Sequence, residues 1–158
     1  MSCAFVSLIL NDWRYEVKSI ILGLALLASP ALAASDVVMH RDPGCGCCEK
    51  WAAQVKKAFG RNVRVIDDRN RVAFQRNSGV PSALVSCHTA VIDGMIFEGH
   101  VPISDIQRVL KLRPAGVKGL AVAGMPLGSA GMEVPGVPAP RYNVIAFGGG
   151  GTRIYVRH

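Results

Sequence analysis

The sequence lacks the motifs of several large enzyme classes. Its 158 residues contain no Walker phosphate loop, no dinucleotide-binding glycine pattern and no hydrolase nucleophile elbow. Nothing in the chain therefore supports chemistry on an organic substrate.

Acidic residues are few, and the chain carries a formal net charge of +7 from 18 basic and 11 acidic residues. Such a balance often accompanies nucleic-acid binding. The arginines are scattered, however, and no basic run interleaved with aromatic residues occurs. We expect no nucleic-acid partner and a generally basic surface, with an anionic partner surface as the alternative.

Long apolar runs are also missing. The apolar run at residues 20–28 is too short to span a bilayer, and it follows Lys18 and precedes the small-residue site Ala31-Leu32-Ala33. This pattern predicts a signal peptide at residues 17–33, cleavage near Ala33 and a periplasmic protein without a membrane span. An uncleaved N-terminal membrane anchor is the alternative.

Residues 1–16 fit no signal peptide, because Asp12, Arg14 and Glu16 lie between two apolar runs. We predict that this extension is not translated and that Val17 is the initiating residue, which N-terminal sequencing of the precursor would test. Residues 34–158 are then one domain of ordinary size.

The hydrophobic periodicity of residues 34–113 predicts alternating strands and helices. A hairpin turn is predicted at Asp93-Gly94, and a helix starts at Pro102. The predicted strands are 36–41, 62–66, 88–92 and 95–98, and the predicted helices are 49–59, 70–77 and 102–112. This β-α-β-α-β-β-α order predicts the α/β (α+β) class and a thioredoxin-like domain.

Glycine and proline dominate residues 114–140, which predicts a long irregular loop that is a lid, a binding loop or a linker. Two strands at 142–147 and 152–156, joined by four glycines, predict a C-terminal β-hairpin that pairs with the sheet edge.

Three cysteines crowd the turn before the first predicted helix. Cys45 and Cys48 form a C-x-x-C motif at a helix N-terminus, where thiolates are stabilised, and this pattern alone is typical of thioredoxin-type redox proteins. Cys47 changes the interpretation, because neighbouring Cα atoms are about 3.8 Å apart, too close for a relaxed Cys47–Cys48 disulfide. In an oxidising compartment, crowded sulfurs are better protected by a metal.

Soft thiolates that share a small volume favour Cu(I) in a multinuclear cluster, with zinc as the competing ion. Cys87 can complete the sulfur set, and His88 and His100 can supply nitrogen ligands. Met125 and Met132 lie in the glycine-rich loop, where they are either soft Cu(I) ligands or core filler.

Four motifs resemble those of the periplasmic CopG-type copper-resistance proteins, long known only as a domain of unknown function. They are Pro43-Gly44-Cys45-Gly46-Cys47-Cys48-Glu49-Lys50-Trp51, Ser86-Cys87-His88-Thr89-Ala90, Glu98-Gly99-His100-Val101-Pro102 and Gly124-Met125-Pro126-Leu127-Gly128-Ser129. The resemblance implies a thioredoxin-like fold, a cysteine-bridged copper cluster and Cu(I)/Cu(II) interconversion in copper detoxification. It implies metal ligands at Cys45, Cys47, Cys48 and Cys87, and further ligands at His88, His100, Met125 and Met132.

Three functions follow from these observations. The first is a periplasmic copper-binding redox protein of copper resistance, a copper oxidoreductase if it turns over. The others are a thiol-disulfide oxidoreductase, for which Cys45 and Cys48 suffice, and a passive copper or zinc chaperone. The expected partners are copper ions and periplasmic copper-export or redox proteins.

Overall fold

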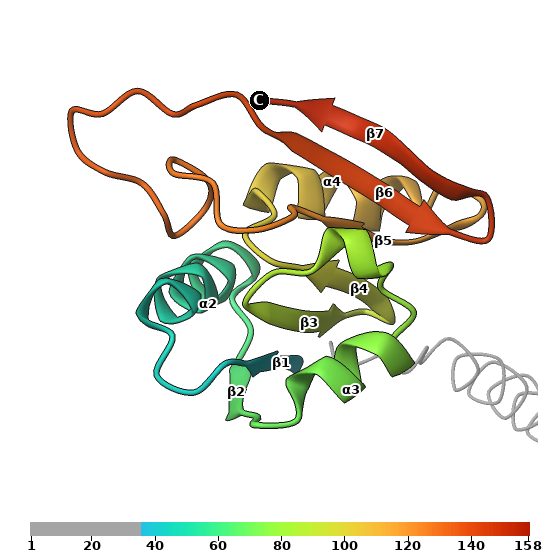
Figure 1. Ribbon diagram of the computed structural model, residues 1–158, viewed down its shortest axis with the longest axis horizontal. Helices are drawn as coiled ribbons and strands as arrows, with labels where there is room; N and C mark the ends of the chain where they lie inside the picture. The colour runs from blue at the N-terminus through green and yellow to red at the C-terminus, as the bar shows by residue number, and fades with distance from the viewer. Residues whose placement is uncertain (1–35) are drawn as a thin grey trace, which may run out of the picture. The chain divides into compact units, whose positions relative to one another are not determined.

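A seven-stranded sheet forms the centre of residues 36–158, the part of the chain that the computed structural model describes. Its strand order is β2-β1-β3-β4-β5-β6-β7, which Figure 1 shows from β2 at one edge to β7 at the other. The strands are β1 (Val37–Arg41), β2 (Val63–Asp67), β3 (His88–Ile92), β4 (Met95–Glu98), β5 (Val117–Ala121), β6 (Asn143–Gly148) and β7 (Gly151–Arg157). The predicted extension 1–16 and signal peptide 17–33 lie outside the described residues.

Three helices pack on this sheet: α2 (Gly46–Phe59), α3 (Arg71–Asn77) and α4 (Ile103–Leu112), with a short 3₁₀ turn, η2 (Ser82–Leu84). Strand β1 is parallel to β2 and antiparallel to β3, and β4 is parallel to β5. The remaining neighbours are antiparallel. The mixed α+β class and the element order through α4 are confirmed, and the finer likeness to thioredoxin stays a prediction.

Alternation along the strands separates two faces of the sheet. On one face, His88, Ala90 and Ile92 of β3 are buried, and the core there includes Trp51 and Val55 of α2 together with Ile106 and Val109 of α4. On the other face, Ile96 packs with Val80, Leu84, Ala121 and Phe147, and α3 contacts β1 and β3. The sheet therefore has a face covered by α2 and α4 and a face covered by α3.

Strand β5 corrects the prediction that residues 114–140 form only an irregular loop. Gly119 lies in the middle of this strand, where a Cβ atom would stand 2.1 Å from the carbonyl oxygen of Ile96 on the neighbouring strand. The close approach of the two backbones requires glycine, and the same glycine hid the strand pattern in the sequence.

The segment between β5 and β6 has no regular helix or strand, as predicted, and Figure 1 shows it running beside α2 before it enters β6. The predicted C-terminal hairpin is present as β6 and β7, with its β6 strand paired to β5. No helix within residues 36–158 is long and apolar enough to cross a membrane.

Candidate metal centre

The first helix carries the cysteine motif in its opening turn. Helix α2 begins at Gly46, three residues before the predicted start, so that Cys45 is its N-cap and Cys47 and Cys48 lie within the first turn. The backbone amides of this turn have no partners within the helix, and they favour negative charge on nearby sulfurs. Arg41 fixes the N-cap by donating to the carbonyl oxygen of Cys45 at 2.9 Å.

The segment that leads into β3 forms the facing wall. The Sγ atom of Cys87 lies 3.3 Å from the Sγ atom of Cys48, although 39 residues separate them in the sequence. The backbone N–H of Asp42 donates to the carbonyl oxygen of Cys87 at 3.0 Å, which ties this segment to the turn before α2. The second wall predicted from Cys87 and His88 is therefore in contact with the cysteine motif.

Two overlapping groups of ligand atoms result. The first group is Cys45, Cys47, Cys48 and Cys87, and the second is Cys48, Cys87, His88 and His100. Within each group, one ligand atom per residue lies within 4.8 Å of every other. The structure thus brings together all six predicted cysteine and histidine residues.

His100 has its ring orientation set by the glycine-rich loop. Its Nδ1 atom donates to the carbonyl oxygen of Ala130 at 2.8 Å, because a carbonyl can only accept. In the neutral ring the other nitrogen, Nε2, then keeps its lone pair, and it lies 3.1 Å from the Sγ atom of Cys87. A backbone acceptor on the outer nitrogen is the usual support for a metal-binding histidine.

His88 carries an unexplained polar atom. The residue is fully buried, and its Nε2 atom has no hydrogen-bond partner among the described residues. Its Nδ1 atom lies 3.6 Å from the Sγ atom of Cys87. Nδ1 is therefore the ring nitrogen shown beside the sulfurs, and in the neutral ring it can accept a ligand bond when the proton lies on Nε2.

Burial sets the protonation of these groups. Burial raises the pKa of the Cys87 thiol to about 12. Burial also holds the pKa of His88 well below its ordinary value and lowers the pKa of His100. Both imidazoles are therefore kept neutral, as metal ligands must be, whereas a cation must displace the proton of Cys87.

Two of the sulfurs are joined in the structure. Cys45 and Cys48 form a disulfide with their Cα atoms 5.4 Å apart, while Cys47 and Cys87 are free. The Cα separation lies in the ordinary range for a disulfide, as the C-x-x-C spacing indicates. Cys47 remains close, with its Sγ atom 3.3 Å from that of Cys45.

Trp51 supports the two histidines from inside the core. It is fully buried, and its indole N–H donates to the carbonyl oxygen of Val101 at 2.9 Å. Its ring is tilted against that of His88 with the centroids 4.5 Å apart, and His88 in turn meets His100 edge-on at 5.1 Å. The imidazoles are thereby held by packing as well as by hydrogen bonds.

The two predicted methionine ligands lie in the loop that contributes Ala130. Met125 is 55% exposed and Met132 is half-buried. Their role as ligands stays a prediction.

Two features of the centre were missed in the sequence. The carbonyl of Ala130 gives no sequence signal, because any residue offers a backbone acceptor. Glu98 lies in the Glu98-Gly99-His100 motif without a predicted role, and it is fully buried with three hydrogen-bond donors around its carboxylate. A buried acidic residue cannot be distinguished from an exposed one by the strand pattern alone.

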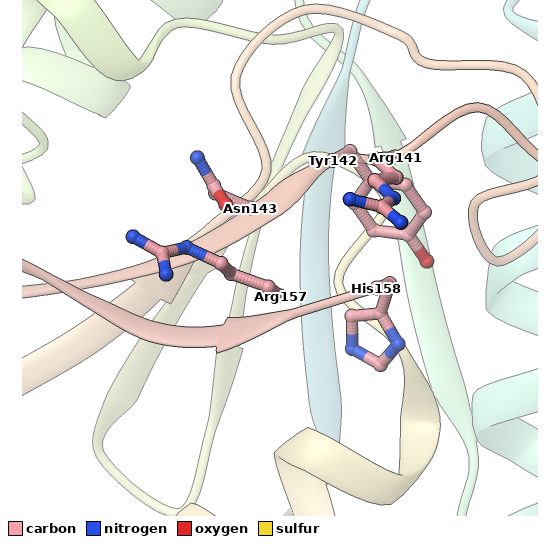
Figure 2. A pocket seen from close by; sticks show the side chains of 5 residues that line it. All are labelled: Arg141, Tyr142, Asn143, Arg157 and His158. Carbon is pink, nitrogen blue, oxygen red and sulfur yellow. The ribbon is translucent and has the colours of Figure 1, made fainter.

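A separate hollow of about 380 Å³ lies at the C-terminal hairpin, lined by Arg141, Tyr142, Asn143, Arg157 and His158. Figure 2 shows the guanidinium groups of its two arginines pointing in different directions. None of its lining residues belongs to either group of metal-ligand atoms.

Known proteins share the segments that carry these cysteines and histidines. Residues 84–132, which include Cys87, His88 and His100, match a family described as a protein of unknown function, DUF411. The chain is also similar to a solved structure named copper resistance protein CopG, form 1, with 36% identity and a TM-score of 0.71. That match covers 80% of this chain and 98% of the other. The chain belongs to the CopG family of copper resistance proteins.

A second solved structure of the CopG family, form 2, is 39% identical with a TM-score of 0.69, and the match covers 80% of this chain and 99% of that one. No curated protein matches the chain. Membership of the CopG family and the cysteine and histidine cluster together fit a copper-binding role.

Proposed function

We propose that this protein binds copper ions through the thiolates of Cys45, Cys47, Cys48 and Cys87, with His88 and His100 as nitrogen ligands. The observation that carries the proposal is the pair of overlapping groups, one of four sulfurs and one of two sulfurs and two imidazoles, with the ligand atoms of each group within 4.8 Å of one another. Thiolates select Cu(I) over harder ions, and zinc is the competitor. Cys48 and Cys87 belong to both groups, which supports a site that holds more than one ion.

The mixed ligand set supports interconversion of Cu(I) and Cu(II). Sulfur favours the reduced ion, whereas imidazole accepts either oxidation state. Copper is the substrate of this step. Each Cu(I) that is oxidised passes one electron to a redox protein of the same compartment, and each Cu(II) that is reduced takes one electron from such a protein.

The Cys45–Cys48 disulfide must be opened before all four sulfurs can bind. Two electrons and two protons convert it to two thiols, and copper then displaces the thiol protons. We expect the protein reduced with a dithiol, then freed of the reagent, to bind more Cu(I) per chain than the oxidised protein. Equal copper content in the two forms would argue that Cys45 and Cys48 are not ligands.

The predicted signal peptide supports a periplasmic location, where free thiols are readily oxidised and a bound metal would protect them. Met125 and Met132 are proposed as additional thioether ligands, because their loop supplies the acceptor for His100. Periplasmic copper-export or redox proteins are the proposed partners.

The disulfide itself favours a second candidate, a thiol-disulfide oxidoreductase that uses Cys45 and Cys48. Cys47→Ser separates the two functions. The copper function predicts that this variant, once reduced, loses most of the bound copper measured by elemental analysis. The oxidoreductase function predicts that it keeps full insulin-reductase activity and that the unmodified protein needs no copper for that activity.

A further inference from the structure

A buried carboxylate lies on the opposite face of the sheet from α2. Glu98, the last residue of β4, is fully buried and accepts three hydrogen bonds. The donors are the backbone N–H of Ser86 at 2.8 Å, the hydroxyl of Thr89 at 2.5 Å and the side-chain amide of Gln75 at 2.8 Å. All three neighbours donate, so the site is built for a group that only accepts.

Two of these donors bracket the metal ligands in the chain. Ser86 precedes Cys87, Thr89 follows His88, and one carboxylate holds both ends of this four-residue segment. The alternation of β3 directs Thr89 toward Glu98 and His88 toward the core face covered by α2. The carboxylate therefore fixes the segment from behind while its ligands face the cysteine motif.

Arg71 of α3 extends this support to the other wall. One terminal nitrogen of its guanidinium group, Nη2, donates to the carbonyl oxygen of Ser86 at 2.6 Å, and Nε donates to a carboxylate oxygen of Asp42 at 2.8 Å. Its Nη1 atom lies 3.5 Å from Glu98. Since Asp42 immediately precedes the turn into the cysteine motif, Arg71 joins the two ligand-bearing segments.

Glu98 is also close in the chain to a third ligand. Gly99 follows it at a φ of +69°, and a Cβ there would lie 2.5 Å from the Oγ atom of Ser86. The backbone of the Glu98-Gly99-His100 motif is thus pressed against the Ser86 segment. We therefore expect a shift of Glu98 to move both the segment of Cys87 and His88 and the turn that carries His100.

We propose that Glu98 is a positioning residue of the metal centre, which holds Cys87 and His88 in register with His100 and the cysteine motif. This inference rests on the proposed copper binding. Removing a group that hydrogen-bonds directly to a metal ligand typically lowers metal affinity about 10- to 100-fold. Glu98 instead bonds to the residues on either side of Cys87 and His88, so we expect a loss at the lower end of this range.

The test is the Cu(I) affinity of Glu98→Met, measured on the reduced protein by competition with a chromophoric Cu(I) chelator. We expect a loss of about tenfold, together with altered copper–sulfur distances in the X-ray absorption spectrum. Methionine has about the length of glutamate but no carboxylate oxygen, so the Ser86 amide loses its acceptor and should exchange its hydrogen faster in the metal-free protein.

Asp105→Leu is the matched control. Asp105 is equally buried, and its carboxylate accepts from His158 at 2.7 Å rather than from the ligand segment. This variant should lose thermal stability but keep wild-type copper affinity, absorption spectrum and Ser86 exchange. If it weakens copper binding as much as Glu98→Met, the effect is general destabilisation and the inference fails.

Thr89→Val keeps the carboxylate and removes one donor, and it serves if Glu98→Met does not fold. We expect it to weaken Cu(I) binding in the same direction by a smaller factor. Wild-type affinity and spectrum in whichever variant folds would overturn the inference. A wild-type protein that binds no Cu(I) would instead overturn the proposed function, and Ser86 exchange would still decide whether Glu98 holds the segment.

Discussion

At the scale of single residues, the protonation states of the two histidines and of Cys87 decide how the site can take up a cation. His100 gives its Nδ1 proton to the carbonyl of Ala130, and burial keeps both imidazoles neutral. The same burial keeps Cys87 protonated when no cation is present. Under the proposed function, copper binding therefore exchanges the proton of Cys87 for a metal ion.

This exchange makes copper affinity depend on pH. Because the pKa of Cys87 is about 12, its thiol is protonated throughout the accessible range and must release a proton when copper binds. Each unit of falling pH should weaken Cu(I) binding by about tenfold through this thiol alone. Competition titrations between pH 6 and 9 would measure the slope. Cys87→Ser should reduce the slope by one proton, and an unchanged slope would contradict the assignment of Cys87 as a ligand.

The neutral histidines predict a second pH effect, on the stability of the metal-free protein. The pKa of His88 is held well below its ordinary value by burial, so the unfolded chain binds protons that the folded protein does not. The free energy of unfolding should therefore fall as pH drops below about 6.5, by about 1.4 kcal/mol per unit for each such histidine. Urea unfolding at pH 7.5, 6.5 and 5.5 would measure it.

Replacing the titrating ring provides the control for that effect. His88→Gln should unfold at lower urea concentration at every pH but show a shallower decline between pH 6.5 and 5.5. A decline as steep as that of the wild type would show that other groups cause it.

At the scale of elements, the sequence could predict which residues meet but not what holds them. The cysteines could be predicted at a helix N-terminus from the C-x-x-C spacing and the apolar face of residues 49–59. The motif at Cys87 and His88 predicted the second wall of the site. The early start of α2 was missed because Gly46 and two cysteines are weak helix formers. Strand β5 was missed because Gly119 interrupts its pattern.

Contacts made by backbone groups or by buried polar side chains left no periodic signal. The acceptor at Ala130 and the donors around Glu98 depend on the tertiary arrangement of segments far apart in the chain. Hydrophobic periodicity reports which face of an element is buried, and it does not report which polar group is buried with it.

The contact between the glycine-rich loop and α2 yields a prediction at this scale. Gly131 has a φ of +82°, and a Cβ there would lie 2.8 Å from the backbone nitrogen of Trp51 and 2.9 Å from the carbonyl oxygen of Cys47. Gly131→Ala should displace the loop, withdraw the acceptor of His100 and weaken copper binding. Its loss of stability should exceed the roughly 1–2 kcal/mol of left-handed backbone strain alone.

Gly136→Ala is the matched control in the same loop. Gly136 has a φ of +75°, and a Cβ there would meet no atom of the described residues within 4 Å. This variant should lose only the roughly 1–2 kcal/mol of stability that left-handed backbone strain costs, and it should keep wild-type copper affinity. Thermal unfolding and chelator competition on the two variants would measure both effects, and equal behaviour of the pair would show that the loop does not support the metal centre.

At the scale of the whole molecule, a small basic domain places its reactive atoms where two distant segments meet on one face of a mixed sheet. The CopG family relationship and the cluster of cysteine and histidine residues fit a copper-binding role. What separates a redox protein from a passive chaperone is whether the bound ion changes oxidation state while it stays bound.

Voltammetry of the reduced, copper-loaded protein, with copper content measured on the same sample, would detect such a change of oxidation state in the bound ion. We predict several copper ions per chain and a reversible wave that is lost in Cys47→Ser. A single tightly held Cu(I) with no reversible wave, or a wave unchanged by Cys47→Ser, would show that the cysteine cluster is not a redox-active copper site.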